Sequence, residues 1–218
     1  MLCQFQKIIA QKSITQNLLV LFLGGYSSNH MAKENVCYNS LMPIYFVRHG
    51  ESVANVRRVM AGQKDDCALT DLGMQQARLA GEELVSTGIT RIVSSPLKRA
   101  LSTAEEIADV IGFDPDMIEI DDRIQEYDMG ALTGTPVRVV SSLELTTAYD
   151  SEDALAFRDR VLSFLRENKD SSETILMVSH GGVGRSIEAA KRGIDAHEFY
   201  GMPHYPNAHP IKLDLDWL

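Results

Sequence analysis

From residue 44 onward, short apolar runs alternate with segments whose apolar residues recur every three or four positions. The short runs suit strands that are buried on both faces, and the periodic segments suit amphipathic helices. We predict strands over residues 44–47, 89–93, 117–120, 174–179 and 211–215, and helices over residues 70–87, 95–111, 151–168 and 183–192. Alternating strands and helices favour an α/β fold, a three-layer α/β/α sandwich around a mostly parallel sheet.

Glycine, serine and proline positions give the expected helix boundaries. Gly88 and Gly112 follow the first two predicted helices, and glycine commonly ends a helix. Ser95 can cap the second helix, with Pro96 at its first position. Residues 122–150 lack a clear period apart from one short helix near residues 137–145, so we expect a short, irregular lid region there.

Residues 1–41 differ in character from the rest of the chain. They are rich in Gln, Asn and Ser, and their lysines outnumber a single acid, Glu34. The apolar run at residues 18–23 is shorter than a secretory signal requires, and no clear small-residue cleavage site follows it. We therefore expect an extension outside the fold, a single domain over residues 42–218, and a cytoplasmic protein. The sequence leaves open whether the natural chain starts at Met42 or whether the extension directs targeting.

Charge and cysteine content restrict the classes of partner. The net charge is −9, and an acidic chain repels both nucleic acid phosphates and anionic lipids. No run approaches the ~20 apolar residues that span a bilayer. Cys3, Cys37 and Cys67 match no metal-site spacing, which indicates free thiols in a reducing compartment. We expect neither a nucleic acid nor a membrane as partner.

Two histidines follow buried strands at the places where each strand is predicted to end. His49 is followed by Gly50, and His180 is followed by Gly181 and Gly182. In α/β sheets, ligands bind at the carboxyl ends of the parallel strands. Glycines there let backbone N–H groups approach an anion, and a helix that starts nearby contributes a favourable dipole. Two such segments can together form one phosphate-binding site.

Arg99 lies in the first turn of a predicted helix, after the strand at residues 89–93. A cation at that end opposes the helix dipole, which is unfavourable unless an anion lies nearby. A residue that is locally unfavourable in this way is typical of a functional site.

Five segments then occur in the order of a known family. They are RHGES at residues 48–52, LTDLG at 69–73, SSPLKRA at 94–100, Glu126 with Gly130, and SHGG at 179–182 with Arg185. Together they resemble the motifs of the histidine phosphatase (phosphoglycerate mutase-like) superfamily, over residues 44 to about 213. A single short motif is weak evidence, but five in order are specific.

The resemblance implies a catalytic division of labour. His49 attacks phosphorus and becomes phosphohistidine, and Glu126 protonates the leaving group and later activates water. The flanking cations disfavour protonated His49 and so keep its lone pair available. Asp128 is the alternative to Glu126, because it lies in the same irregular segment.

The resemblance also implies a phosphate-binding set. Two guanidiniums can hold the phosphoryl oxygens in fork geometry, so no metal or other cofactor is expected. The expected phosphate-binding residues are Arg48, Asn55, Gly62, Arg99, His180 and Gly181. Asn55 has a turn-capping alternative. His204 has no motif, and we assign it no role.

The sequence also bears on whether the phosphoryl group goes to water, as in a phosphatase, or back to the product, as in a mutase. In the family that this chain resembles, glycolytic mutases carry an arginine directly after the catalytic acid and a long insertion beyond it. In this chain Tyr127 follows Glu126, and the lid region is short. The predicted short helix of this lid offers one cation, Arg138, which Glu144 offsets. The acid phosphatase branch is unlike this chain, which has Ser52 and Gly181 where that branch has an arginine and an aspartate.

We therefore expect a phosphomonoesterase that acts on a small phosphorylated metabolite. A cofactor-dependent phosphoglycerate mutase is the first alternative, and a non-catalytic protein that binds phosphorylated ligands is the second. The identity of the substrate is open, and both a monomer and a homodimer fit the sequence.

Overall fold

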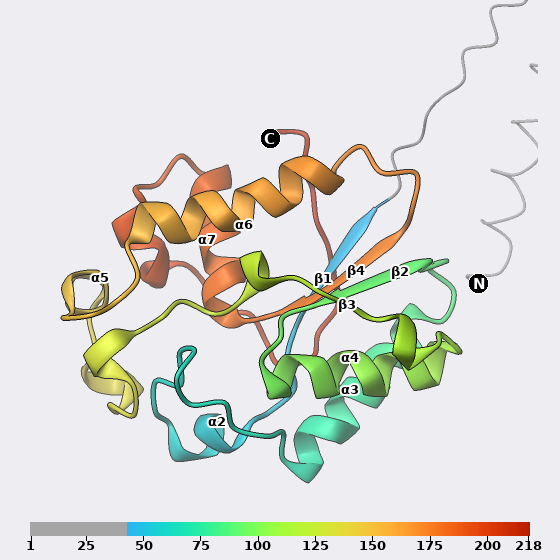
Figure 1. Ribbon diagram of the computed structural model, residues 1–218, viewed down its shortest axis with the longest axis horizontal. Coiled ribbons are helices and arrows are strands. Elements are labelled where there is room, and N and C mark those ends of the chain that lie inside the picture. Colours follow the sequence, from blue (N-terminus) through green and yellow to red (C-terminus); the bar gives the residue numbers. More distant parts are fainter. Residues whose placement is uncertain (1–42) are drawn as a thin grey trace, which may run out of the picture. The chain divides into compact units, whose positions relative to one another are not determined.

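A five-stranded sheet forms the centre of the computed structural model, which describes residues 43–218 (Figure 1). Its strands are β1 (Ile44–Arg48), β2 (Arg91–Ser94), β3 (Glu119–Ile120), β4 (Ile175–Ser179) and β5 (Ile211–Lys212). Their order in the sheet is β3-β2-β4-β1-β5, and only β5 pairs antiparallel with its neighbour. The predicted mostly parallel sheet is confirmed.

Helices cover both faces of this sheet. The pairs are α3 (Asp71–Leu84) with α4 (Lys98–Ile111), and α6 (Ala154–Asn168) with α7 (Gly181–Lys191), and they lie on opposite sides of the strands in Figure 1. Strand β4 shows the reason, because all five of its residues are buried and its side chains alternate between two cores. Leu176 and Val178 pack with residues of α3 and α4, whereas Ile175 and Met177 pack with residues of α6 and α7. The three-layer sandwich is confirmed.

Shorter elements form the connections between these strands and helices. Two are short α-helices, α2 (Val53–Arg57) and α5 (Ser142–Thr147). The others are 3₁₀ turns, η1 (Pro115–Met117), η2 (Asp122–Ile124), η3 (Gly130–Leu132), η4 (Val137–Val139) and η5 (Ala196–Gly201). The single short helix predicted near residues 137–145 is thus divided into η4 and α5.

The predicted cap of the second helix is wrong. Helix α4 begins at Lys98, and its N-cap is Leu97, which makes no side-chain capping bond. The Ser95 hydroxyl instead accepts from the Leu97 backbone N–H at 3.3 Å and hydrogen-bonds with His180 Nε2 at 2.7 Å. Ser95 therefore links the end of β2 to the end of β4.

The N-terminal segment lies outside the part of the chain that the structure describes. The predicted extension over residues 1–41, with Cys3 and Cys37, lies outside residues 43–218 and stays a prediction. Within residues 43–218, no helix is both long and apolar enough to cross a membrane.

Candidate active site

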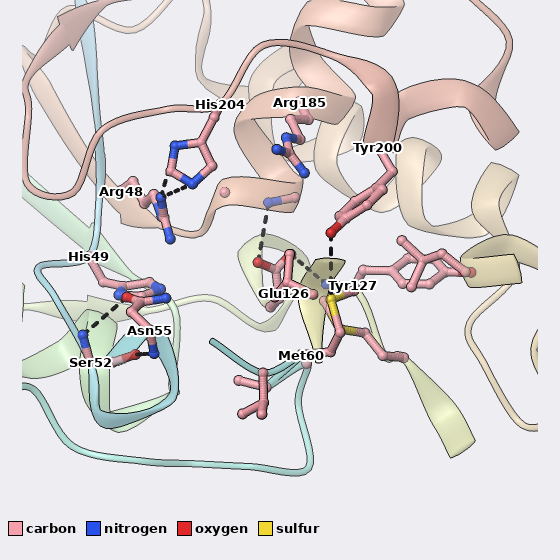
Figure 2. Close-up of a pocket in the computed structure, with 18 of the residues that line it drawn as sticks. Arg48, His49, Ser52, Asn55, Met60, Glu126, Tyr127, Arg185, Tyr200 and His204 are labelled. Carbon is pink, nitrogen blue, oxygen red and sulfur yellow. Dashed lines mark hydrogen bonds between the residues drawn. The ribbon is translucent and has the colours of Figure 1, made fainter. Parts of the chain in front are cut away.

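A pocket of about 150 Å³ lies beside the carboxyl ends of β1 and β4. Figure 2 shows His49, Ser52 and Asn55 on one side of it, Glu126 and Tyr127 on the other, and Arg48, Arg185 and His204 above. The predicted site residues that line it are Arg48, His49, Asn55, Gly62, Arg99, Glu126 and Gly181. The structure thus brings together segments that are far apart in the sequence.

His49 is held in the protonation state that a nucleophile needs. Its Nδ1 lies 2.7 Å from the Gly50 carbonyl, and since a carbonyl only accepts, Nδ1 carries the proton and Nε2 keeps its lone pair. Burial lowers the pKa of His49 well below its ordinary value of 6.5, and the charges of Arg99 and Arg48 lower it further. His49 is therefore neutral at neutral pH.

His180 lies directly beside the nucleophile. The two imidazole ring centres are 5.3 Å apart, and His180 is fully buried. It does not itself line the pocket, but its Nδ1 is buried without a hydrogen-bond partner among the described residues. Burial, followed by the charge of Arg99, lowers the pKa of His180 well below 6.5. The unpartnered Nδ1 is the atom available for the predicted contact with a ligand.

Arg48 is anchored through one end of its guanidinium. Its Nη1 donates to the Tyr205 carbonyl at 2.7 Å and to His204 Nε2 at 2.7 Å, while its buried Nε has no partner within residues 43–218. Burial lowers the pKa of Arg48 to about 10, so the side chain stays charged at neutral pH. The Nε and Nη2 atoms remain free to bind an anion.

His204 is a pocket residue that the sequence did not identify. A guanidinium only donates, so His204 Nε2 must accept from Arg48 and the ring is neutral. Burial, then Arg48 and Arg185, lowers its pKa to about 4. Its only sequence signal was its place in a loop near the chain end.

Arg99 is almost fully buried and is fixed by two backbone carbonyls. Its guanidinium donates to the Gly62 carbonyl at 2.7 Å and to the Asp65 carbonyl at 3.2 Å. Burial lowers its pKa. Gly62 has φ of +56°, and a Cβ there would lie 3.2 Å from Met129 atoms. Gly62 lines the pocket as predicted, but the contact that the structure gives it is to Arg99.

Glu126, rather than Asp128, faces the pocket. One carboxylate oxygen accepts from the Gly182 N–H at 3.2 Å and the other from the Tyr127 N–H at 2.9 Å. A Cβ on Gly182 would lie 2.1 Å from Glu126 Oε1, so a side chain at this position would displace the carboxylate. The Asp128 side chain instead accepts from the Gly130 N–H at 3.0 Å and does not line the pocket.

Arg160 holds the segment that carries Glu126. It donates to the carbonyls of Arg123 at 2.7 Å, Gln125 at 2.8 Å and Glu126 at 3.0 Å. Its other donors form a two-pronged contact with Glu152 at 2.6 and 2.9 Å. No sequence pattern marked this residue, because its partners are mainly backbone atoms far away in the chain.

Two further side chains complete the wall. Asn55 lines the pocket, and its Oδ1 accepts from the Ser52 N–H at 3.1 Å in the cap of α2. The turn-capping alternative is thus present, and the phosphate contact of Asn55 stays a prediction. Arg185, which the motif contained without an assigned role, stacks on the Tyr200 ring at 4.6 Å. Its Nε is buried without a partner among residues 43–218. The pocket thus combines three guanidiniums, two neutral imidazoles and a carboxyl group, which suits transfer of a phosphoryl group.

Comparisons with known proteins agree with this geometry. The family profile of the histidine phosphatase superfamily (branch 1) matches residues 44–216. A curated relative, the probable phosphoglycerate mutase GpmB of Yersinia pestis, is 39% identical over 97 residues, which are 44% of this chain and 43% of the relative. The match therefore spans less than half the length of that relative.

Two solved structures share the fold. YhfR from Bacillus stearothermophilus is 25% identical with a TM-score of 0.67, over 80% of this chain and 92% of that one. A mycobacterial glucosyl-3-phosphoglycerate phosphatase is 25% identical with a TM-score of 0.61, over 76% of this chain and 86% of that one. Because the family profile covers nearly all of the described residues, this chain belongs to the histidine phosphatase superfamily.

Proposed function

We propose that this protein is a phosphomonoesterase in which His49 accepts the phosphoryl group and water then releases it as phosphate. The observation that carries the proposal is the free Nε2 of a neutral, buried His49, which faces the same pocket as Arg48, Arg99 and Glu126. An unprotonated nitrogen between cations is suited to attack an anionic phosphorus centre.

In the first half-reaction, His49 Nε2 forms a bond to phosphorus while the bond to the ester oxygen breaks. Protonated Glu126 gives its proton to the departing oxygen, which leaves as an alcohol. In the second half-reaction, the Glu126 carboxylate removes a proton from water as the water oxygen attacks phosphorus and the bond to Nε2 breaks. Free enzyme, protonated Glu126 and inorganic phosphate result.

The binding groups neutralise the phosphoryl oxygens throughout this cycle. Arg48 contributes Nε and Nη2, and the buried guanidinium of Arg99 adds a second positive charge. Helix α7 begins at Gly181, so its N-terminal dipole also favours an anion in the pocket. Since phosphoryl transfer depends mainly on positioning and charge neutralisation, these groups account for most of the expected acceleration.

A phosphoglycerate mutase is the second candidate, because the curated relative with 39% identity over 97 residues carries that name. A mutase must retain its product long enough to return the phosphoryl group. The lid here consists of the short elements η4 and α5, and Tyr127 is buried in the hydrophobic core behind the acid. These features favour release to water over retention.

Phosphate release from phosphorylated metabolites and from p-nitrophenyl phosphate, measured with a chelator present, tests the proposal. We expect one phosphate for each substrate molecule consumed, on a small phosphorylated metabolite as the preferred substrate. Interconversion of phosphoglycerates without phosphate release would instead identify a mutase. Complete inactivity of the folded protein on every substrate would favour a protein that only binds phosphorylated ligands.

A further inference from the structure

A second, larger hollow of about 660 Å³ adjoins the catalytic pocket. The two cavities share the lining residues Arg48, Asn55, Val59, Val137 and His204. The catalytic pocket is only about 150 Å³, so it suits the phosphoryl group better than a whole substrate. The hollow is therefore an adjacent space into which the rest of a substrate can extend.

The lining of the hollow is strongly basic. Arg57, Arg58 and Arg138 join Arg48 there, and among the residues that the structure describes no Asp or Glu side chain lines it. Arg57 forms an ion pair with Asp65, which reduces its capacity to attract another anion. Arg58 and Arg138 form no salt bridge and no side-chain hydrogen bond with any residue in 43–218. These two guanidiniums are available for a ligand.

The charge of Arg138 is not offset in the way that its sequence neighbourhood suggested. Glu144 is occupied by the cap of α5, where its carboxylate accepts from the Ser141 N–H at 2.8 Å and from the Ser141 hydroxyl at 2.7 Å. It makes no ion pair with Arg138 in the part of the chain that the structure describes. The expectation that Glu144 neutralises Arg138 is therefore wrong.

Backbone contacts bring the two arginines together. The Val137 N–H donates to the Arg58 carbonyl at 3.0 Å, and Val59 forms a bridge with Pro136. Arg58 itself ends α2 with φ of +54° and ψ of +43°, a left-handed conformation that is uncommon for residues other than glycine. Strained backbone of this kind persists where the surroundings impose it, and it clusters at ligand sites.

We propose that Arg58 and Arg138 form a second anion site, which binds a carboxylate or a further phosphate of the substrate while His49 attacks the scissile phosphoryl group. The inference rests on the proposed function and narrows its substrate class to phosphomonoesters that carry a second anionic group. It also gives a protein of net charge −9 a local means of attracting an anionic substrate.

Two matched substrate pairs test this site. The pairs are 3-phosphoglycerate with glycerol 3-phosphate, and 6-phosphogluconate with sorbitol 6-phosphate, which differ within each pair by a carboxylate in place of a hydroxymethyl group. We expect the wild-type kcat/KM to favour the carboxylate member of at least one pair by about tenfold, less at high salt. The R58Q and R138Q variants should each reduce that preference, chiefly by lowering kcat/KM for the carboxylate member of the pair.

Arg166→Gln is the control, because Arg166 is exposed on α6, lines neither cavity and changes the net charge equally. Equal efficiencies within both pairs would overturn the second anion site, as would a preference that R58Q and R138Q leave intact. A preference lost equally in R166Q would also overturn it, since general charge attraction would then be the cause. Failure of the wild-type enzyme on p-nitrophenyl phosphate and on all four esters would contradict the proposed function instead.

Discussion

The two sides of the pocket are built in different ways. His49 and His180 follow the buried strands β1 and β4, and the His49 N–H donates to the Ser179 carbonyl at 2.9 Å, so the sheet itself sets their spacing. Glu126 lies in an irregular segment that Arg160 holds from α6 through three backbone carbonyls. The nucleophile is thus positioned by secondary structure, whereas the acid is positioned by a few individual side-chain contacts. The acid side should be easier to disturb without loss of the fold.

The largest effect is expected on the nucleophile side. His49→Ala should reduce kcat by about 10⁴-fold or more, because no other pocket group can form the covalent intermediate. Steady-state hydrolysis of p-nitrophenyl phosphate measures the loss. His197→Ala, which alters an exposed histidine outside the pocket, should retain full activity. An active His49→Ala enzyme would remove the nucleophile from the proposed mechanism.

Loss of the acid should depend on the leaving group. Glu126→Gln should lower kcat for alkyl phosphates by about 10²–10⁴-fold and affect aryl phosphates much less, since an aryloxide leaves with little protonation. A series of substrates of graded leaving-group pKa measures the slope. Asp128→Asn is the matched control, because Asp128 lies two residues away and outside the pocket lining. A steeper slope in Asp128→Asn than in Glu126→Gln would reassign the acid.

The glycine that adjoins the acid offers a gentler disturbance. In Gly182→Ala the new Cβ would start 2.1 Å from Glu126 Oε1, so the carboxylate must move. We expect a loss of about 10²-fold in kcat, which is typical of a displacement near 1 Å. Gly181→Ala is the comparison, because the closest atom to its Cβ would be Arg48 Nε at 3.4 Å. Wild-type kcat in Gly182→Ala would show that the contact with Glu126 is unimportant, whatever the effect of Gly181→Ala.

Arg160→Lys should show whether Arg160 acts through the acid. A lysine keeps the charge but cannot replace the forked contacts, so we expect kcat for alkyl phosphates to fall about tenfold, with aryl phosphates affected less. The free energy of unfolding should also fall by about 2 kcal/mol, because buried carbonyls lose donors. Urea denaturation gives the second value. Equal losses for aryl and alkyl substrates would mean that Arg160 only stabilises the fold.

The smallest effect concerns the buried imidazoles. The pKa values of His49 and His180 are lowered in the folded protein, so the unfolded chain binds more protons below pH 6.5 and the folded state loses stability as the pH falls. Each histidine should contribute about 1.4 kcal/mol per pH unit to this slope. His180→Gln should reduce the slope between pH 6.5 and 5 in urea denaturation. Identical slopes in both proteins would contradict the lowered pKa of His180.

The same contrast explains how much of the molecule could be predicted. Strands β1, β2 and β4 were predictable because burial on both faces leaves continuous apolar runs, and the larger helices because one buried face leaves a clear helical period. Helix α2 was missed because it has only five residues and its Val53 and Val56 side chains are 41% and 60% exposed, so no apolar face marks it.

Two residues of the site could not be identified from the sequence, and the physical reason is the same for both. His204 and Arg160 act on atoms more than thirty residues away in the chain, and most of the partners of Arg160 are backbone carbonyls. Such contacts leave no local pattern of residue types. The assignment of Ser95 as a cap was wrong for a related reason, because a local rule competed with a contact to His180 that the sheet creates.

The side chain that carries the phosphoryl group during turnover is the most direct test of the proposed mechanism. Enzyme quenched under alkaline conditions in mid-reaction, then digested and sequenced by mass spectrometry, locates the phosphoryl group. Since Nδ1 of His49 is engaged with the Gly50 carbonyl, we expect phosphohistidine at residue 49, linked through Nε2. A phosphoryl group on another side chain, or on Nδ1 of His49, would contradict the arrangement described above.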